Sequence, residues 1–391
     1  MRILYASERP PYPFFLGGAA RCAHQLLYSL TNDLGIECAA IGSSDYSVSS
    51  WNYPNTSEYA TLGIRAASNN GWNGALDCGY PVHVFPDFIS ALDDFIDRFK
   101  PDIFWTQLEG AREILELASK KGIQGLFYVH DAEFDPAELR SISDLGCHLV
   151  CSSGFLANKV RKVIGRRAHV VYPASDLYFG TEGNREGYVT MINPFRVKGV
   201  DTFFEIAKRL PAEKFLLLES WKLSDAALME LEKRLAQTPN VRFQQRVSDM
   251  RSIYGQTKLL LVPSVWEEGF GMVAIEAQSC GIPVIASARG GLPESVGDGG
   301  ILIQDYRNAE AWVEAIGKVL GDKTVYQVWT GRALRHAGSA DFVPNELSRR
   351  FLEVCSATAP RPNTYTRGMR AVISRLANTP LLGRLFRQTG Q

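Results

Sequence analysis

The sequence predicts an α/β fold with two domains, each built around a doubly wound parallel β-sheet. The chain has 391 residues, which is more than one ordinary hydrophobic core accommodates. Short runs of Val, Ile, Leu and Phe recur along it, as in strands that are buried on both faces of a sheet. The segments between these runs carry apolar residues at helical spacing, which indicates βαβ units.

In the first half of the chain, each expected strand is a short apolar run followed by a more polar segment. We expect strands at residues 2–6, 37–41, 82–85, 102–105, 126–129 and 148–151. Segments 20–34 and 110–121 are the clearest helices between them, because their apolar residues recur every three or four positions.

The same alternation restarts after about residue 173, and Pro173 itself restricts its neighbours to an extended path. We expect a hinge at 170–176, a first domain over 1–172 and a second over 173–344. The expected strands of the second domain are 188–192, 214–218, 241–243, 259–262, 283–286 and 301–303. Its expected helices are 201–210, 224–236, 249–256, 272–280 and 308–320. Ligands of such sheets bind outside the carboxyl ends of the strands.

The composition indicates which classes of partner the protein binds and in which compartment it is found. The 42 basic and 42 acidic residues cancel, which speaks against a nucleic-acid partner. Seven cysteines without a Cys-x-x-Cys pair favour reduced thiols in a cytoplasmic protein. The first residues contain too short an apolar run for a signal peptide, and no run approaches the roughly 18 residues of a membrane span.

The stretch EEGFGMVAIEA at 267–277 is the most informative part of the sequence. A strand, the turn Gly269-Phe270-Gly271 and a helix N-terminus follow one another there. The first N–H groups of a helix have no partner within it, and the helix dipole adds positive charge, so this arrangement predicts an anion site. Glycines would let a diphosphate approach the backbone closely.

Two glutamates flank this turn. Glu276 lies about one turn into the helix, where its carboxylate could accept hydrogen bonds from the hydroxyls of a ribose. Glu268 precedes the turn and could accept from a sugar hydroxyl. The alternative is that Glu276 only complements the helix dipole while Glu267 and Glu268 are solvated charges. The residues alone leave both interpretations open.

The run from Pro263 to Glu294 closely resembles the signature of retaining glycosyltransferases of family 4, which have the GT-B fold of two Rossmann-like domains facing across a cleft. That signature has two glutamates with seven residues between them, as Glu268 and Glu276 have here. Its Gly-x-Pro-Val appears at 281–284, and its Gly-Gly-x-x-Glu loop appears at 290–294.

The resemblance also implies roles outside this run. Gly17 and Gly18 match a loop that approaches the donor phosphates and the acceptor, although a plain strand-to-helix turn would look the same. His130 matches a histidine near the transferred sugar, and the alternative is a structural histidine. Lys198, with Arg196 before it, matches the pair that holds the donor diphosphate. Here the sequence departs from the family, because Arg196 is only two residues from Lys198.

The family implies transfer of a sugar from a nucleotide-diphosphate sugar to an acceptor hydroxyl with retention of configuration, in polysaccharide or glycolipid synthesis. Lys198, Arg196 and the helix N-terminus would stabilise the departing diphosphate without a metal or another cofactor. No Asp-x-Asp occurs, which speaks against a metal-bridged transferase. The alternatives are a sugar-nucleotide epimerase and a non-catalytic sugar-nucleotide-binding partner of another transferase. A nicotinamide oxidoreductase ranks last, because neither domain has a Gly-x-Gly-x-x-Gly.

The end of the chain, 345–391, is expected to contain a helix followed by a basic tail. In the family a late helix crosses back to the first domain, and the apolar face formed by Leu347, Phe351 and Leu352 is the candidate. Residues 361–391 contain six arginines and no acid. Such an amphipathic end could lie on an anionic membrane surface, which would suit a lipid-linked acceptor. The alternative is a tail packed on the body of the protein or loosely ordered.

Overall fold

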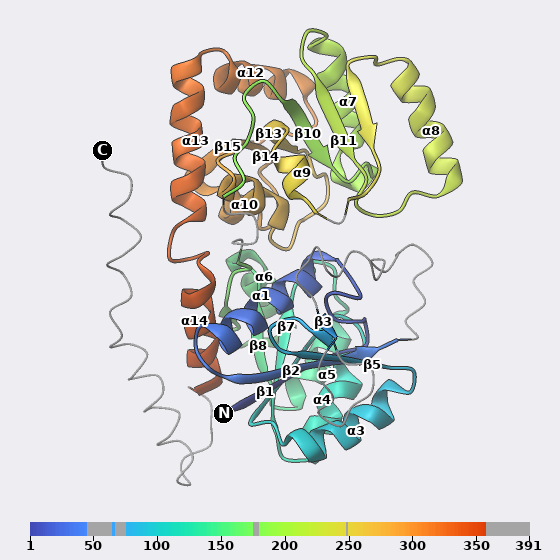
Figure 1. The fold of residues 1–391 in the computed structure, drawn as a ribbon, viewed down its shortest axis with the longest axis vertical. Coiled ribbons are helices and arrows are strands. Elements are labelled where there is room, and N and C mark those ends of the chain that lie inside the picture. The colour runs from blue at the N-terminus through green and yellow to red at the C-terminus, as the bar shows by residue number, and fades with distance from the viewer. Residues whose placement is uncertain (45–64, 67–75, 175–179, 248, 357–391) are drawn as a thin grey trace.

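The computed structural model describes residues 1–44, 65–66, 76–174, 180–247 and 249–356. These residues form two α/β units, each with a central sheet covered by helices (Figure 1). The predicted fold class, two doubly wound parallel-sheet units, is confirmed. The domain boundary at 172 stays a prediction, since 175–179 lie outside the described residues.

The first unit contains a sheet in the order β3-β4-β5-β2-β1-β6-β7-β8-β9. Its strands from β5 to β9 pair in parallel, and β3 and β4 add an antiparallel edge. The strands are β1 Arg2–Ser7, β2 Glu37–Ser43, β3 Arg65–Ala66, β4 Leu76–Asp77, β5 Pro81–Phe85, β6 Ile103–Gln107, β7 Gln124–Val129, β8 His148–Cys151 and β9 His169–Val170. The helices are α1 Gly18–Asn32, α3 Phe88–Phe99, α4 Ala111–Lys120, α5 Pro136–Asp144 and α6 Gly154–Ile164.

The apolar runs of this unit place side chains in the hydrophobic cores on both faces of the sheet. Along β1, Ile3 and Tyr5 enter the core beneath α1, whereas Leu4 and Ala6 enter the core beneath α3 to α6. Successive side chains of a strand point to opposite faces, so a run that is apolar at every position belongs between two helix layers.

The second unit contains a wholly parallel sheet in the order β12-β11-β10-β13-β14-β15. Its strands are β10 Tyr188–Ile192, β11 Phe215–Leu218, β12 Val241–Gln244, β13 Thr257–Val262, β14 Val284–Ser287 and β15 Gly300–Ile303. Its helices are η1 Arg196–Lys198, α7 Val200–Arg209, α8 Asp225–Ala236, α9 Arg251–Tyr254, α10 Met272–Ser279, α11 Leu292–Val296, η2 Gly297–Gly299, α12 Ala309–Leu320 and α13 Lys323–Ala337.

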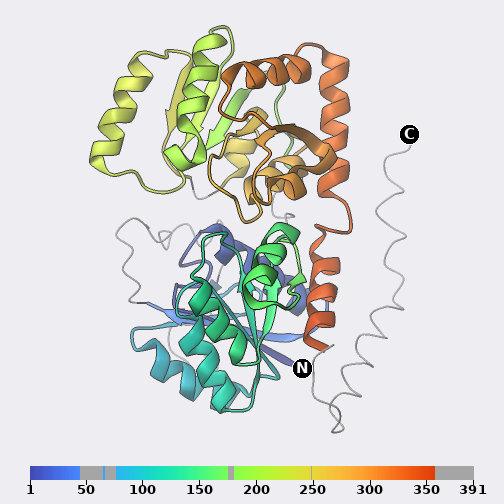
Figure 2. The same cartoon turned by 180° about the vertical axis from the view of Figure 1, so that it is seen from behind.

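The last described helix, α14 (Pro344–Ser356), leaves the second unit and packs on the first (Figure 2). Leu347, Phe351 and Leu352 are buried in the same core as α1, and the ring of Phe351 lies 5.3 Å from that of Trp105. Helix α14 therefore links the two units, because it follows the second unit in sequence and packs in the core of the first. The basic tail, 361–391, lies outside the described residues.

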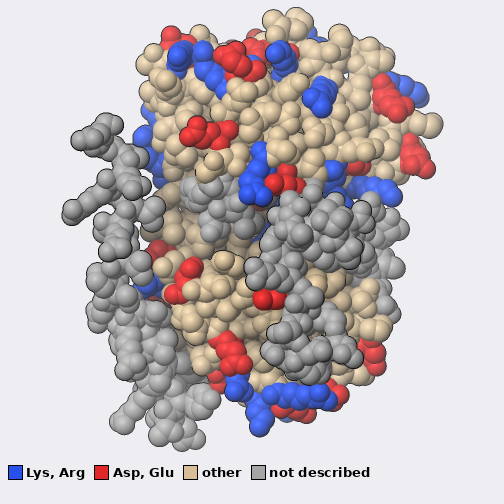
Figure 3. All heavy atoms as spheres, in the orientation of Figure 1, with Lys and Arg blue, Asp and Glu red and all other residues tan. Residues whose placement is uncertain are grey.

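The expected strands are all present, with ends that differ by at most two residues. Helices α3, α5, α6, α11 and α13, the two short helices η1 and η2, and strands β3, β4 and β9 were not predicted. The helix expected at 249–256 is described only over Arg251–Tyr254. The seven cysteines are buried and form no disulfide. Basic and acidic side chains are interspersed over the face shown in Figure 3. Within the described ranges, no helix combines the length and apolar character that crossing a bilayer requires.

Candidate active site

A cavity of about 590 Å³ lies where the carboxyl ends of the two sheets face each other. This volume is within the range of small-molecule sites. Its lining comes from the segments that follow β1, β6, β7 and β8 in the first unit and β10, β11 and β13 in the second. In both sheets the strand order reverses direction beside the first strand, so the cavity lies at the switch points where such folds bind ligands.

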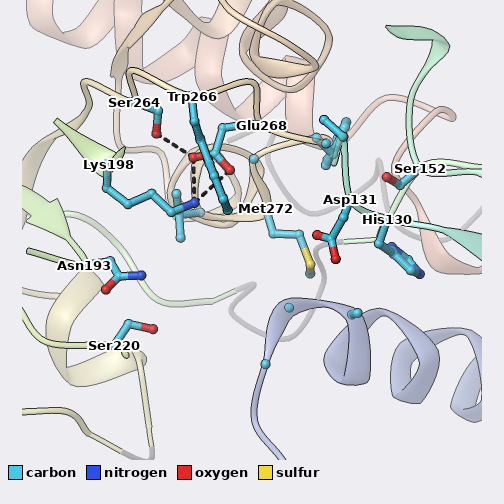
Figure 4. A pocket seen from close by; sticks show the side chains of 18 of the residues that line it. His130, Asp131, Ser152, Asn193, Lys198, Ser220, Ser264, Trp266, Glu268 and Met272 are labelled. Atoms are coloured by element: carbon cyan, nitrogen blue, oxygen red, sulfur yellow. Dashed lines mark hydrogen bonds and ion pairs between the residues drawn. The ribbon is translucent and has the colours of Figure 1, made fainter. Parts of the chain in front are cut away.

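Lys198 and Glu268 form an ion pair in this cavity (Figure 4). Nζ of Lys198 donates to Oε1 and Oε2 of Glu268 at 2.7 and 2.9 Å, and the hydroxyl of Ser264 also donates to Oε1. The two side chains are 15% and 12% exposed, so the pair is shielded from solvent but still reachable from the cavity. It forms because η1 follows β10, Glu268 follows β13, and these two strands are neighbours.

Two tryptophans enclose the same ammonium group. Nζ of Lys198 lies 4.5 Å from the ring centre of Trp266 and 5.0 Å from that of Trp221. A cation at this distance from an indole is attracted by the negative face of the ring. Together with the carboxylate, the indoles hold the Lys198 charge in one place beside the cavity.

The glycine turn and the start of α10, where we predicted an anion site, lie on the second-unit side of the cavity. Gly271 adopts φ 93°, a value that favours glycine, and no side chain caps the first N–H groups of α10. A Cβ at Gly269 would lie 1.8 Å from the carbonyl oxygen of His130, so this turn touches the first unit directly. Gly269, Phe270 and Gly271 all line the cavity.

His130 and Asp131 directly follow β7 in the first unit and lie across the cavity from Lys198, with the His130 ring directed away from Lys198 (Figure 4). The His130 ring stacks on Tyr128 with 4.3 Å between ring centres, and burial lowers the pKa of His130 to about 3. The imidazole is therefore neutral at physiological pH, and its buried Nε2 has no partner among the described residues. Burial raises the pKa of Asp131, while the positive charge of Arg9 opposes that shift.

The start of α1 completes the opposite wall. Gly17 is the N-cap of this helix without a capping side chain, and both Gly17 and Gly18 line the cavity. A Cβ at Gly18 would lie 3.4 Å from the sulfur of Met272, at the start of α10. Two uncapped helix N-termini, one from each unit, therefore meet across the cavity.

Two of the predicted site residues lie outside the cavity lining. Glu276 is 6% exposed, and the hydroxyl of Tyr254 donates to its Oε2 at 2.7 Å. Arg196 is exposed at the start of η1, and it does not line the cavity although Lys198 does. Their roles in binding ribose and phosphate remain predictions.

The structure adds lining residues that we did not identify from the sequence. They are Trp221, Trp266, Ser264, Asp131 and Ser152. The hydroxyl oxygen of Ser152 is buried without a partner among the described residues, and the residue is 1% exposed. Each of these residues follows a strand at its carboxyl end, which was the available signal. Among the described residues, no three His, Cys, Asp or Glu side chains are grouped to hold a metal ion.

Comparisons with known proteins agree with this architecture. Residues 184–322 match the family model described as "Glycosyl transferases group 1". HepE of Anabaena, solved in complex with UDP, superposes with a TM-score of 0.72 at 16% identity, covering 91% of this chain and 100% of that chain. Sucrose-phosphate synthase of Thermosynechococcus elongatus superposes with a TM-score of 0.67 at 17% identity, covering 91% and 98%. The fold is therefore GT-B.

Curated relatives match over a shorter stretch. The D-inositol 3-phosphate glycosyltransferase of Mycobacteroides abscessus is 33% identical over 177 residues, which are 39% of this chain and 39% of that protein. The enzyme of the same name from Salinispora tropica is 40% identical over 114 residues, 28% of this chain and 23% of that protein. The matched segment thus spans well under half of these relatives. Fold, family match and relatives together support the class of glycosyltransferases.

Proposed function

We propose that this protein transfers a sugar from a nucleotide-diphosphate sugar to an acceptor hydroxyl with retention of configuration and without a metal. The observation that carries the proposal is the Lys198–Glu268 pair beside the uncapped start of α10, in a cavity between two GT-B units. Lys198, Glu268 and the glycine turn line the same cavity as residues of the first unit, which supports the proposal.

The difficult step of such a transfer is departure of the diphosphate, which gains negative charge as the glycosidic bond breaks. Fixed positive groups aimed at that charge lower the barrier. Lys198 supplies a full charge, and the N–H groups after Gly271 supply partial charges. In this proposal both contact the diphosphate, and the exposed Arg196 can reach it only by moving from its present position.

The remaining groups would bind the sugar and the ribose. The Glu268 carboxylate accepts from a donor hydroxyl while it keeps its bond to Lys198. The neutral ring of His130 would exchange a hydrogen bond with the transferred sugar after a rotation that exposes its buried Nε2, which has no partner among the described residues. Glu276 would accept from the ribose hydroxyls after a rearrangement of its contact with Tyr254.

The comparisons suggest the class of donor, and the basic tail suggests the class of acceptor. The structures of HepE with UDP and UDP-glucose support a nucleotide sugar as donor. We propose a sugar, glycan or lipid-linked acceptor, in polysaccharide or glycolipid synthesis on the cytoplasmic side. Residues 361–391 would hold the protein on an anionic membrane surface, so their deletion should reduce its sedimentation with anionic vesicles.

The test is transfer by the purified protein, first with a panel of nucleotide sugars and then with the Lys198→Ala and Glu268→Ala variants. We expect each variant to lose about 10²–10³-fold in kcat, the range for removing one group that stabilises developing charge. Lys208→Ala is the matched control, because Lys208 pairs with Glu205 on the exposed surface of α7. EDTA should leave the rate unchanged. Donor binding without transfer or hydrolysis would instead identify a non-catalytic binding partner.

A further inference from the structure

The glutamate of the Gly-Gly-x-x-Glu loop, Glu294, contacts the other unit rather than the cavity. Its carboxylate, on α11 of the second unit, accepts two backbone hydrogen bonds from α6 of the first. The N–H of Gly154 donates to Oε2 at 2.6 Å, and the N–H of Phe155 donates to Oε1 at 2.7 Å. These are the first two residues of α6, so a carboxylate of one unit caps a helix of the other.

Ser153 completes this cap and ties it to the glycine turn. Its hydroxyl oxygen accepts from the N–H of Leu156 at 3.1 Å and donates to the carbonyl oxygen of Gly269 at 2.6 Å. The first three N–H groups of α6 are thus all bonded to side chains. The Glu294 side chain belongs to the second unit, and the Ser153 side chain is hydrogen-bonded to Gly269 of the second unit.

Glu294 is also held from the linker between the units. The hydroxyl of Tyr172 donates to Oε2 of Glu294 at 2.9 Å. The Tyr172 ring packs against Phe270 and Phe342, with ring centres 5.6 and 5.3 Å away. The carboxylate therefore lies where the first unit, the linker and the glycine turn converge.

A movement of α11 would be transmitted to the donor side of the cavity. The N–H of Gly291, at the start of α11, donates to the carbonyl oxygen of Glu268 at 2.8 Å. A Cβ on Gly291 would lie 2.3 Å from the carbonyl oxygen of Gly269, so the two backbones are in direct contact. A shift of the carboxylate that caps α6 would thus move the backbone of Glu268 through these contacts.

We infer that Glu294 is a positioning residue that holds the two units closed, with the glycine turn against His130. This inference rests on the proposed transferase function, because closure matters only if both units act on one substrate pair. A second contact between the units, Lys159 to Glu267 at 2.8 Å, has side chains 35% and 42% exposed and contributes little. The hydrogen bonds to the Glu294 carboxylate are the stronger kind, because the acceptor is charged.

The experiment compares wild type with Glu294→Ala, Glu294→Gln and the control Glu310→Ala. Glu310 is a matched carboxylate, since it pairs with Arg209 within the second unit and is exposed. We expect Glu294→Ala to increase the radius of gyration measured by small-angle X-ray scattering without nucleotide. We also expect kcat/KM to fall about 10–100-fold, as loss of two charge-assisted hydrogen bonds predicts. Glu294→Gln keeps one acceptor and should lie between wild type and Glu294→Ala, and Glu310→Ala should match wild type.

Two readouts separate this inference from the proposed function. If Glu294→Ala folds and matches wild type in both scattering and kcat/KM, Glu294 does not position the units. If Glu294→Ala fails to fold, unchanged scattering and kinetics of Glu294→Gln would equally overturn the inference. If the wild type transfers no sugar, the proposed function fails, while scattering still reports whether Glu294 closes the cleft.

Discussion

At the scale of single residues, Lys198 is held in place on the second-unit side of the cavity. Among the described residues of the second unit, it is the cation that lines the cavity, whereas Arg196 lies on the surface. Its ammonium contacts the Glu268 carboxylate and lies over the faces of Trp221 and Trp266. A side chain fixed in this way loses little conformational entropy when a ligand arrives, as the proposed phosphate contact requires.

The position of Gly269 leaves no space for a side chain. Gly269→Ala would place a Cβ 1.8 Å from the His130 carbonyl oxygen, where the neighbour is backbone and cannot simply rotate away. We expect the variant to fold but to lose transfer at least about 10²-fold, because a displacement of about 1 Å at a reacting centre has that effect.

The control for this variant is Gly317→Ala, in the interior of α12. Apart from the neighbouring backbone of α12 itself, no atom of the described residues lies within 4 Å of the added Cβ there, so the control should keep full activity. It should also raise the free energy of unfolding by about 0.5–1 kcal/mol, because alanine favours a helix over glycine. Transfer rates and urea unfolding of Gly269→Ala and Gly317→Ala test both expectations. A fully active Gly269→Ala would contradict the close contact.

At the scale of elements, α14 couples the two units by belonging to one in sequence and to the other in packing. Three apolar side chains on one face of this helix, Leu347, Phe351 and Leu352, are at most 2% exposed. They complete the core that α1 and the first sheet share. The first unit is therefore incomplete without a helix that follows the second unit in the chain.

Phe351→Ala tests this coupling. The ring is fully buried against Trp105, so its removal should lower the free energy of unfolding of the first unit by about 3–5 kcal/mol. Urea unfolding followed by circular dichroism measures the change. Leu334→Ala on α13, where the side chain is 43% exposed, is the control and should change stability by less than about 0.5 kcal/mol. Equal stability of the two variants would mean that α14 is dispensable to the core.

At the scale of the whole molecule, buried histidines make stability sensitive to acid. Burial lowers the pKa of His24 and of His130 to about 3, and that of His83 and of His148 to about 4. A histidine in the unfolded chain has a pKa near 6.5, so the unfolded state binds more protons than the folded state below that pH. The stability contributed by these neutral rings is complete above about pH 6.5 and is lost progressively as the pH falls toward the folded pKa.

His24 allows a quantitative test, because it is 8% exposed and stacks on Tyr12. Between pH 7.5 and 5.5 its titration should cost about 1.4 kcal/mol of unfolding free energy. His24→Phe keeps a ring but cannot titrate. Although it loses the hydrogen bond to Tyr80, its stability should fall less between these pH values than that of wild type. Equal losses in urea titrations of both proteins would rule out the lowered pKa.

Local sequence patterns were sufficient for the expected strands, but not for every helix. Apolar runs such as Leu259–Val262 are read correctly because a strand buried on both faces needs no partner to be recognised. Helix α6 was missed although Ser153 caps it and Gly165 ends it with φ 74°. Its cap is partly supplied by Glu294, 140 residues away, which no local pattern contains. Trp221 and Trp266 were missed for a related reason, since their role depends on where Lys198 lies.

What the sequence by itself determined is therefore the kind of fold and the position of the glycine turn before a helix, because both follow from the periodicity and backbone freedom of neighbouring residues. The tertiary structure alone decided which residues share the cavity and how the units meet. It pairs Lys198 with Glu268, leaves Arg196 on the surface and brings Gly269 against His130. Such contacts depend on the order of strands in two sheets and on the distance between those sheets, which no short stretch of the chain encodes.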